Sequence, residues 1–551
     1  MSVLIIGGGI NGAGVFRDLA LQGVDVLLVD KSDFSSGTSS ATSHMAHGGL
    51  RYLENGDFNL VREAVSERNL LIENAPHYVN PLPTTIPIFK WYSGLLNAPL
   101  KFLGLLDKTV ERGAMLIKIG LLLYDSFTRS TGTVLRHRFM SRSDSLARFP
   151  LLNPDVLCTA TYYDASILAP ERVCTELICD ALDMGGHAQV ANYVSAFGAF
   201  GEEVRLRDEL TGETYTVKPK LVVNASGPWI DKVNQSLKRD TALVSGSKGS
   251  HIVIDNYQLR TAISNHEFFF ENDDGRIVLI CPLADKILIG TSELFCDDPN
   301  HVCCTPEEVD YFITMILKVF PQAVVSKDQI VFSFSGVRPL MFGKSSDPGN
   351  ISRDHRVLLL SPGQGIDFPI YTLVGGKWTT FRSLAEKATD QTLITLGRKR
   401  QYSTRNLSIG GGKDYPQGMD AEKRFLDNII LETGFEAHRV KELFDRYGTR
   451  AANVASFIAG ETEETDPCLD NHAGYTRGEI TFLTRHEYVL RLEDLILRRT
   501  LLAMLGEISV GLIVELAQVV GDELGWSEST RKDEVDDVLS VLSRKHGVKL
   551  C

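Results

Sequence analysis

The 551-residue sequence contains little that would indicate metal-binding or disulfide chemistry. Its nine cysteines form no Cys-x-x-Cys pair, and only Cys303 and Cys304 are adjacent. A zinc cluster or a redox-active dithiol requires closely spaced cysteine pairs, so neither is expected and we predict no metal site. Reduced and mostly buried thiols are typical of a cytoplasmic protein, which is the compartment we expect.

Long hydrophobic runs and an excess of positive charge are also missing. The most apolar stretch, residues 91–127, is interrupted by charged side chains such as Lys101, Asp107 and Lys118, and no run reaches the roughly 20 apolar residues that span a bilayer. The first residues lack the basic segment and cleavage site of a secretory signal. The net charge of −13 argues against nucleic-acid binding, which requires clustered Lys and Arg.

The remaining composition is that of a large globular protein with several structural units. Hydrophobic residues make up 43% and charged residues 23% of the chain, which is a normal balance for a packed core. The N-terminal pattern predicts a buried strand at residues 3–6, a helix at 11–22 that ends at Gly23, and a second strand at 24–29. Such a succession is typical of an α/β fold.

A glycine motif occupies the turn between the first strand and the helix. Gly7, Gly9 and Gly12 form G-x-G-x-x-G, and Asp30 ends the second strand. The glycines allow a tight turn, a close approach of pyrophosphate, and packing of helix on strand, while the acid can accept ribose hydroxyls. The helix N-terminus offers unpaired N–H groups to phosphate. The motif therefore predicts a dinucleotide-binding site.

Two later glycine-bearing segments favour FAD over NAD. One segment, at residues 224–228, follows a predicted strand. The other, at 374–377, precedes a predicted helix that begins near Trp378. A second helix N-terminus suits the electron-rich end of a flavin.

Residues 244–335 are rich in short strands, typical of an antiparallel sheet. After Gly412 the chain reads as helical, with apolar stripes predicted to be packing faces. The stripes are Val489, Leu492 and Ile496; Leu512, Leu516, Val519 and Val520; and Val535, Val538, Leu539 and Leu542.

Several motifs together resemble those of a known family over essentially the whole chain. They are IGGGINGAG at 6–14, HGGLRYLE at 47–54, SGPW at 226–229, KGSH at 248–251, SGVRPL at 335–340, GGK at 375–377, RHEYV at 485–489 and RRT at 498–500. The sequence resembles the FAD-dependent glycerol-3-phosphate dehydrogenases of the aerobic, quinone-linked type.

The fold that we expect is α/β, with a Rossmann-like FAD-binding domain of the glutathione-reductase type. The predicted boundaries assign 1–85, 151–243 and 336–395 to this discontinuous domain. Residues 86–150 and 244–335 are expected to form an antiparallel-sheet substrate domain with an insertion. Residues 396–551 are expected to form a helical C-terminal cap domain.

The resemblance implies hydride transfer from C2 of sn-glycerol 3-phosphate to flavin N5, giving dihydroxyacetone phosphate. His251 is carried over as the base for the hydroxyl proton, Arg338 and Arg51 as phosphate ligands, and Lys377 as a cation that stabilises negative charge. Substrate contacts are assigned to Arg51, Tyr52, His251 and Arg338. The implied cofactor contacts are Gly7, Gly9, Ile10, Asn11, Gly12, Asp30, Ser39, Ser40, His47, Gly48, Gly49, Leu50, Ser226, Gly227, Gly336, Gly376 and Thr379.

The implied partners are a polyol phosphate and a membrane quinone, with peripheral attachment to the inner face of the cytoplasmic membrane and a possible homodimer. Four alternatives stay open on sequence alone. They are a longer substrate such as erythritol 4-phosphate, oxygen as the electron acceptor, an amino-acid oxidase, and a flavin-binding regulatory protein without turnover. Covalent attachment of FAD through His44 or His47 is conceivable but not expected.

Two features depart from the family pattern. Where the family usually has Ser-Lys, this chain has Ser43-His44, so a cationic contact to the flavin is lost or altered. Residues 91–127 form a longer insertion in which basic residues lie among leucines. Apolar area and basic residues together favour the membrane interface, and an ordinary buried helical insertion is the alternative interpretation.

Overall fold

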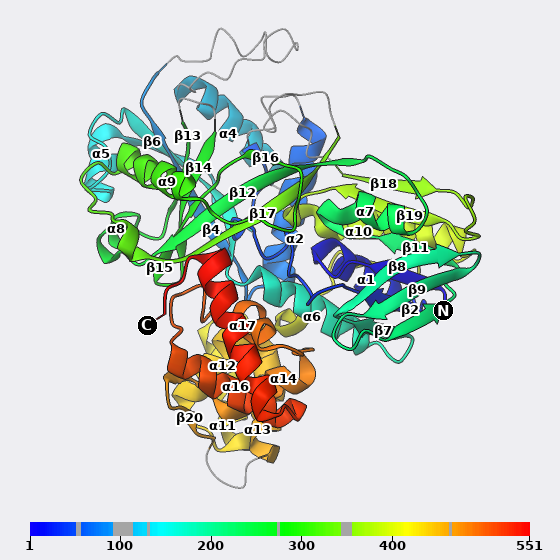
Figure 1. Cartoon of the computed structure of the whole chain (residues 1–551). Coiled ribbons are helices and arrows are strands. Elements are labelled where there is room, and N and C mark those ends of the chain that lie inside the picture. Colours follow the sequence, from blue (N-terminus) through cyan, green and yellow to red (C-terminus); the bar gives the residue numbers. More distant parts are fainter. Residues whose placement is uncertain are drawn as a thin grey trace.

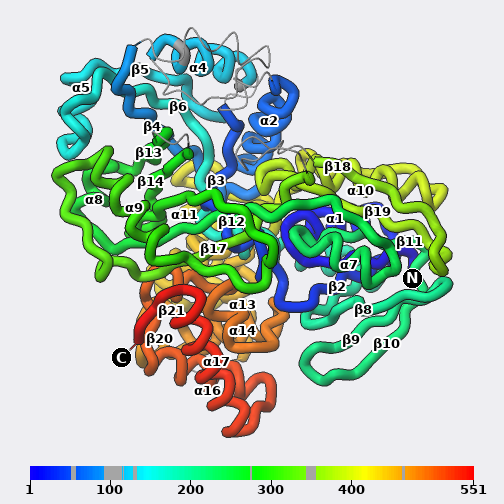
Figure 2. Tube along the Cα trace, turned by 45° about the horizontal axis from the view of Figure 1, so that its top comes forward, coloured from blue at the N-terminus to red at the C-terminus, as the bar shows by residue number. Residues whose placement is uncertain are grey.

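The computed structural model describes residues 1–50, 57–91, 114–128, 133–272, 276–342, 355–461 and 466–550. Two sheet-containing parts lie side by side, and the helices of the C-terminal segment pack against them at one end (Figure 1). Figure 2 shows the same division from a second angle. Among the described residues, no helix is both long and apolar enough to cross a bilayer.

The first part is built on a six-stranded sheet with the strand order β18-β19-β11-β1-β2-β7, parallel except for β18. The strands are β1 (Val3–Ile6), β2 (Val26–Val29), β7 (Ala188–Ala191), β11 (Leu221–Asn224), β18 (His355–Leu360) and β19 (Ile370–Gly375). In β1, Val3 and Ile5 face the helices α1 (Ile10–Leu21), α6 (Pro170–Leu182) and α10 (Phe381–Thr395). Leu4 and Ile6 face the opposite side. The predicted strand covered on both faces is confirmed.

The opposite side of this sheet is covered by a small three-stranded sheet, β8 (Val194–Phe200), β9 (Glu203–Asp208) and β10 (Thr214–Val217). The predicted first helix and second strand are also present. The helix α1 begins one residue earlier than expected, and β2 begins at Val26 rather than residue 24. Gly23 adopts a positive φ of 64°, so the turn after α1 extends beyond the glycine before the strand resumes.

The second part is a ten-stranded, mostly antiparallel sheet. Its main order is β16-β12-β15-β14-β13-β4-β6-β3, with β17 paired to β12 and β5 paired to β6. The strands are β3 (Met45–Ala46), β4 (Val79–Ile88), β5 (Arg138–Ser141), β6 (Cys158–Ile167), β12 (Val244–Ile254), β13 (Glu267–Glu271), β14 (Ile277–Leu283), β15 (Lys286–Gly290), β16 (Leu294–Cys296) and β17 (Ile330–Met341). Its outer face packs on helices α5 (Arg142–Arg148), α8 (Tyr257–Ala262) and α9 (Pro306–Val319).

Four strands of this sheet differ from the domain division that the sequence suggested. The short strand β3 lies in the range 1–85 that we assigned to the FAD-binding domain, yet it pairs with β6 in the second sheet. We assigned most of β4 and all of β6 to the FAD-binding domain, yet they pair with each other over ten residues in the second sheet. The boundary at 335/336 falls inside β17. The strand β4 contains three prolines, at positions 81, 83 and 87. All three have odd numbers, so their missing N–H groups lie along one edge of the strand.

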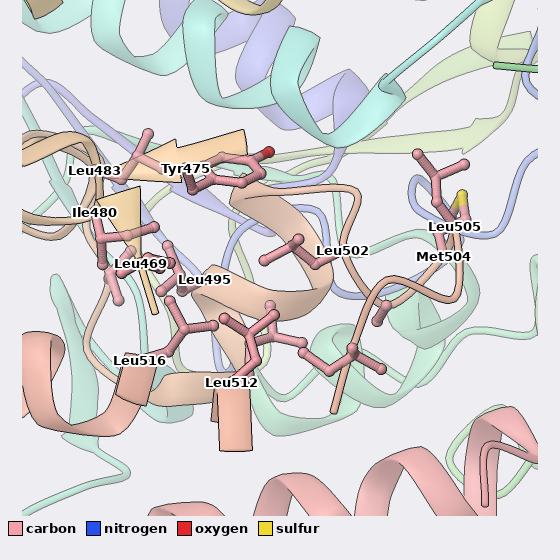
Figure 3. Close-up of a cluster of buried hydrophobic side chains, with 14 of the residues drawn as sticks. Leu469, Tyr475, Ile480, Leu483, Leu495, Leu502, Met504, Leu505, Leu512 and Leu516 are labelled. Carbon is pink, nitrogen blue, oxygen red and sulfur yellow. The ribbon is translucent and has the colours of Figure 1, made fainter. Parts of the chain in front are cut away.

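The C-terminal segment forms a helical domain with its own hydrophobic core. Its helices are α11 (Met419–Thr433), α12 (Ala437–Tyr447), α13 (Ala451–Glu461), α14 (Arg477–His486), α15 (Leu492–Asp494), α16 (Val510–Leu524) and α17 (Glu528–His546), with a short hairpin of β20 (Cys468–Leu469) and β21 (His472–Thr476). Figure 3 shows leucines from several of these elements meeting in one cluster. The predicted apolar stripes all contribute to this core, Val535 and Leu539 at its partly buried margin.

Candidate active site

One large cavity, about 1000 Å³ in volume, lies between the two sheets and beside the helical domain. Its walls come from the turn after β1, the segment 35–50, the loops that follow β11 and β19, and the strand β17. The turn after β1 and the loops after β11 and β19 meet because these three strands are neighbours in a parallel sheet. In open α/β folds, ligands bind at the carboxyl edge of such a sheet.

The glycine motif forms one end of this cavity. Gly7 has φ +108°, and a Cβ there would lie 2.7 Å from the carbonyl oxygen of Ala225. A Cβ on Gly12 would lie 1.8 Å from the carbonyl oxygen of Gly7, so only glycine allows α1 to start this close to β1. Ser39 accepts the N–H of Ile10 at 2.9 Å and thereby fixes the neighbouring loop to the helix N-terminus.

Asp30 closes this end of the cavity. Its carboxylate accepts the backbone N–H of Gly8 at 2.6 Å and that of Ser32 at 2.9 Å. Burial raises the pKa of Asp30 to about 6. Nearby, the buried side-chain oxygen of Asn11 lines the cavity and has no hydrogen-bond partner among the described residues. A glycine turn, a helix N-terminus, an acid and an unsatisfied amide oxygen together fit a dinucleotide such as FAD.

Arg338 on β17 marks the other end of the cavity. Its guanidinium donates a hydrogen bond to the hydroxyl of Thr291 at 2.7 Å. Gly249 lies on the paired strand β12, where a Cβ would lie 2.2 Å from a guanidinium nitrogen of Arg338. The glycine in the KGSH motif therefore leaves the space in which the arginine side chain lies across the sheet.

A buried acid holds the backbone beside Arg338. Glu308, in the first turn of α9, accepts the hydroxyls of Ser292 at 2.5 Å and Ser250 at 2.9 Å. Its second oxygen accepts the ammonium of Lys248 at 2.7 Å. Because Ser292 follows the residue that Arg338 contacts, this network fixes the segment against which the guanidinium rests.

His251 does not line the cavity. It is only 1% exposed, and its ring stacks on Phe334 with centroids 4.9 Å apart. Its Nε2 lies 2.9 Å from the hydroxyl of Ser43, which does line the cavity, and its Nδ1 has no hydrogen-bond partner among the described residues. Burial and the nearby charge of Arg338 hold the pKa of His251 well below its ordinary value. The imidazole is therefore neutral and reaches the cavity only through Ser43.

Lys377 lies on the loop after β19, directly before the short helix Trp378–Thr380 that leads into α10. It is 9% exposed and lines the cavity. In that short helix the hydroxyl of Thr379 accepts the backbone N–H of His47 at 3.2 Å. This bond joins the short helix that follows the GGK motif to the HGG motif, so that two segments 332 residues apart in sequence form one wall.

His44, at the position where the family usually has lysine, does not face the cavity. Its Nδ1 lies 3.2 Å from the carbonyl oxygen of Leu168, and burial lowers the pKa of His44 to about 4. The side chain is therefore uncharged, so this position supplies no cation to the cavity.

Most of the residues predicted from sequence line this one cavity. They are Gly7, Gly9, Ile10, Asn11, Asp30, Ser39, Ser40, His47, Gly49, Leu50, Ser226, Gly227, Gly336, Arg338, Gly376, Lys377 and Thr379. Gly12 and His251 lie behind its wall, and so does Gly48, whose N–H donates to Asp164 at 2.9 Å. Arg51 and Tyr52 lie outside the described residues.

Sequence reasoning missed several residues that line the cavity. Ser43 and Thr291 are ordinary polar residues in sequence, and only their contacts to His251 and Arg338 distinguish them. Lys545 and His546 reach the cavity from the end of α17. The ring of His546 stacks on Phe332 with centroids 4.3 Å apart, and its Nδ1 lies 2.9 Å from the carbonyl oxygen of Ser333. No local signal near the C-terminus indicated this contact.

Buried ion pairs fix the helical domain to the cavity wall. Asp33, three residues after Asp30, is fully buried and accepts hydrogen bonds from both Arg498 and Arg499. Arg498 also lines the cavity. The RRT motif thus acts at the joint between the domains. Within the described residues, no group of three or more His, Cys, Asp or Glu side chains could hold a metal ion.

Comparisons with known proteins agree with this architecture. Residues 2–364 match the family described as FAD dependent oxidoreductase, and residues 402–531 match the C-terminal domain of alpha-glycerophosphate oxidase. The chain belongs to the FAD-dependent oxidoreductase family, which confirms the prediction of FAD rather than NAD.

Within that family it belongs with the glycerol-3-phosphate dehydrogenases. It is 32% identical to the enzyme of that name from Synechocystis sp., over 96% of this chain and 93% of the relative. It is 31% identical to the enzyme from Pseudomonas tolaasii, over 91% of this chain and 92% of the relative. It is 29% identical to the mitochondrial enzyme from Bos taurus, over 99% of this chain and 74% of the relative. The solved structure of glycerol-3-phosphate dehydrogenase from Bacillus halodurans complexed with FAD, at 24% identity, has a TM-score of 0.74 and covers 99% of this chain and 95% of that one. The predicted fold class is confirmed.

Proposed function

We propose that this protein oxidises sn-glycerol 3-phosphate to dihydroxyacetone phosphate and passes the electrons to a membrane quinone. One observation carries the proposal. A single cavity joins the glycine turn and Asp30 at one end to Arg338, Lys377 and Ser43 at the other. Bound FAD supplies the acceptor for the hydride that leaves C2 of the substrate. The cavity therefore combines a dinucleotide site with a cationic pocket, which fits a cofactor and a phosphate substrate bound together.

The residues at the far end have complementary tasks in this reaction. Arg338 binds the phosphate through its planar pair of donors and is held in place by Thr291. Lys377 stabilises negative charge that develops on the substrate oxygen. Oxidation of the alcohol also releases the hydroxyl proton, which Ser43 accepts while it donates its own proton to Nε2 of the neutral His251. His251 thus acts as the proton acceptor through Ser43 and positions that hydroxyl.

The electron acceptor that we propose is a quinone, reached from a peripheral position on the inner face of the cytoplasmic membrane. Oxygen is the second candidate, because the C-terminal segment matches the C-terminal domain of alpha-glycerophosphate oxidase. The two acceptors use the same substrate half-reaction and differ only in reoxidation of the cofactor.

Anaerobic titration of the purified holoprotein tests the substrate half-reaction. Glycerol 3-phosphate is expected to bleach the visible flavin absorbance, whereas glycine, an amino-acid substrate without a phosphate, should leave it unchanged. Erythritol 4-phosphate is the matched control for chain length. Bleaching by the longer substrate alone would replace the proposed substrate, and a flavin that no polyol phosphate reduces would contradict the proposal.

Reoxidation of the substrate-reduced protein separates the two acceptors. A soluble ubiquinone analogue is expected to restore the flavin absorbance much faster than air-saturated buffer does. Faster reoxidation by oxygen, with formation of hydrogen peroxide, would show an oxidase.

A further inference from the structure

The imidazole of His251 lacks the hydrogen bond that usually orients a histidine base. Such a ring is commonly held by a carboxylate or a carbonyl oxygen at the nitrogen that faces away from the reaction. Among the described residues, the buried Nδ1 of His251 has no hydrogen-bond partner, and Nε2 is bonded to the hydroxyl of Ser43 at 2.9 Å. Because the outer torsion of a histidine side chain is soft, the contacts on the two faces of the ring must set its orientation.

Two neighbouring strands enclose the ring of His251. On one side the ring of Phe334 on β17 stacks on it, with centroids 4.9 Å apart and 13° between the planes. On the other side lies Gly290 on β15, where a Cβ would be 2.1 Å from Cδ2 of His251. Both residues are directly paired with His251 across the sheet. The imidazole therefore lies in a narrow slot between a phenylalanine ring and a glycine.

The end of α17 holds the strand that carries Phe334. Figure 1 shows α17 reaching from the helical domain to the second sheet, where it contacts β17. The ring of His546 stacks on Phe332, with centroids 4.3 Å apart and 12° between the planes. Ser333 donates its hydroxyl to the carbonyl oxygen of His546 at 3.0 Å and accepts Nδ1–H of His546 at 2.9 Å. Phe332 and Phe334 lie on the same face of the strand, with centroids 6.3 Å apart.

We propose that His546, Phe332 and Phe334, called the aromatic stack below, position the imidazole of His251 for proton transfer through Ser43. The three act as positioning residues, because Phe334 touches the base and the other two hold Phe334 in place. The inference rests on the proposed function, in which His251 accepts the proton. It also gives the helical domain a task at the substrate end of the cavity, in addition to its ion pairs beside the nucleotide end.

The groups around His251 determine what a loosened stack would change. Burial, followed by the charges of Arg338 and His44, holds the pKa of His251 well below its ordinary value. His44 itself is neutral, since burial lowers its pKa to about 4. Removing the ring of Phe334 would expose the imidazole to water and relieve the burial that disfavours its charged form. The pKa of His251 should then rise, and a protonated imidazole cannot accept the substrate proton.

A titration of His251 by NMR tests the stack without any substrate. In the holoprotein labelled with carbon-13 at Cε1 of histidine, the signal that His251→Gln removes identifies the residue. The midpoint of its titration should rise in Phe334→Leu and, by a smaller amount, in His546→Ala. His486→Ala is the matched control, because His486 stacks on Phe482 at 4.8 Å in the helical domain and neither residue lines the cavity. The control should leave the midpoint in place. An unchanged midpoint in both Phe334→Leu and His546→Ala would overturn the proposal.

The limiting rate of anaerobic flavin bleaching by glycerol 3-phosphate measures the effect on the reaction. Phe334→Leu should lower this rate by about tenfold and His546→Ala by about threefold. In both variants the acidic limb of the pH–rate profile should move to higher pH, whereas the flavin content and the half-saturating substrate concentration should stay unchanged. Phe334→Tyr keeps the ring and should restore most of the rate. A Phe334→Tyr variant as slow as Phe334→Leu would contradict positioning by the ring.

The double variant Phe334→Leu/His546→Ala tests whether the stack acts as one unit. It should be no slower than Phe334→Leu alone, because His546 reaches His251 only through the phenylalanines. Additive losses would contradict this role of His546. The NMR titration requires no turnover, so a flavin that glycerol 3-phosphate fails to bleach in the unmodified protein would contradict the proposed function while the titration still decides whether the stack sets the environment of His251.

Discussion

The two ends of the cavity are built in different ways. At the nucleotide end the backbone determines the shape, since Gly7 and Gly12 allow two chain segments to meet where any Cβ would clash. At the substrate end side chains determine it. Arg338, Ser43 and Lys377 come from three distant segments and are held by partners such as Thr291 and His251. The glycines of the first arrangement lie in one short motif, although Gly7 also packs against the distant Ala225, whereas the side chains of the second come from three separate motifs.

This contrast predicts that the two ends fail differently. Damage to the glycine turn should remove the cofactor and with it all activity. Damage to the substrate end should leave the flavin spectrum intact and lower turnover, because the side chains there do not shape the turn on which the dinucleotide rests. The predictions below test that separation, beginning with the largest effect.

Gly12→Ala should cause the largest loss. The new Cβ would lie 1.8 Å from the carbonyl oxygen of Gly7, so α1 must move away from β1. We expect FAD affinity to fall by more than about 100-fold and the free energy of unfolding to fall by about 1–3 kcal/mol. The ratio of flavin to protein absorbance and thermal unfolding measure the two effects. Gly186→Ala is the control, since a Cβ there meets nothing within 4 Å.

Arg338→Gln should retain FAD and lower kcat/KM by about 100-fold, because a charge-assisted bond to the phosphate is lost. The kcat/KM of Arg338→Lys should lie between those of the unmodified protein and Arg338→Gln, since an ammonium keeps the charge without the planar pair of donors. Steady-state kinetics and the flavin content of the same sample would distinguish these variants. The control is Arg205→Gln on the exposed side of β9. Loss of flavin from Arg338→Gln would contradict the prediction that changes at the substrate end leave FAD binding intact.

Ser43→Ala should lower kcat by on the order of tenfold, less than Arg338→Gln because a water molecule can replace the missing hydroxyl. KM should change little, since Ser43 is not assigned to the phosphate. Ser43→Thr should restore most of the rate because it keeps a hydroxyl near Nε2 of His251. The double variant Ser43→Ala/His251→Gln should be no slower than the slower single variant if the two act as one unit. Additive losses would show that His251 acts independently of Ser43.

The same contrast explains how far sequence reasoning reached. The glycine turn, Asp30 and α1 were predictable because residues 3–30, a single strand–helix–strand unit, carry the signal. The Ser43–His251 contact was not, because it joins β12 to a loop 208 residues earlier and serine is common everywhere. The membership of β4 and β6 in the second sheet was also missed, because the residues that pair in a sheet lie far apart in sequence.

The smallest expected effect concerns stability and pH. Burial raises the pKa of Asp30 from 3.8 to about 6, so the folded state binds this proton more tightly than the unfolded state does. The stability that Asp30 contributes is fully present below pH 4 and is lost as the pH rises through 6. Between pH 5 and 7, the free energy of unfolding of the flavin-free protein should therefore fall by about 1 kcal/mol relative to that of Asp30→Asn. Urea unfolding of both proteins across this range measures the difference.

His251 provides the opposite case at the other end of the cavity. Burial and Arg338 hold its pKa well below 6.5, so its contribution to stability is present above that value and is lost as the pH falls. Relative to His251→Gln, the unmodified protein should therefore gain stability from pH 5 to 7, whereas relative to Asp30→Asn it should lose stability. Slopes of equal sign in the two comparisons would contradict this. Opposite slopes would mean that one buried carboxylic acid and one buried imidazole, each neutral at mildly acidic pH, set the pH response of the two ends independently.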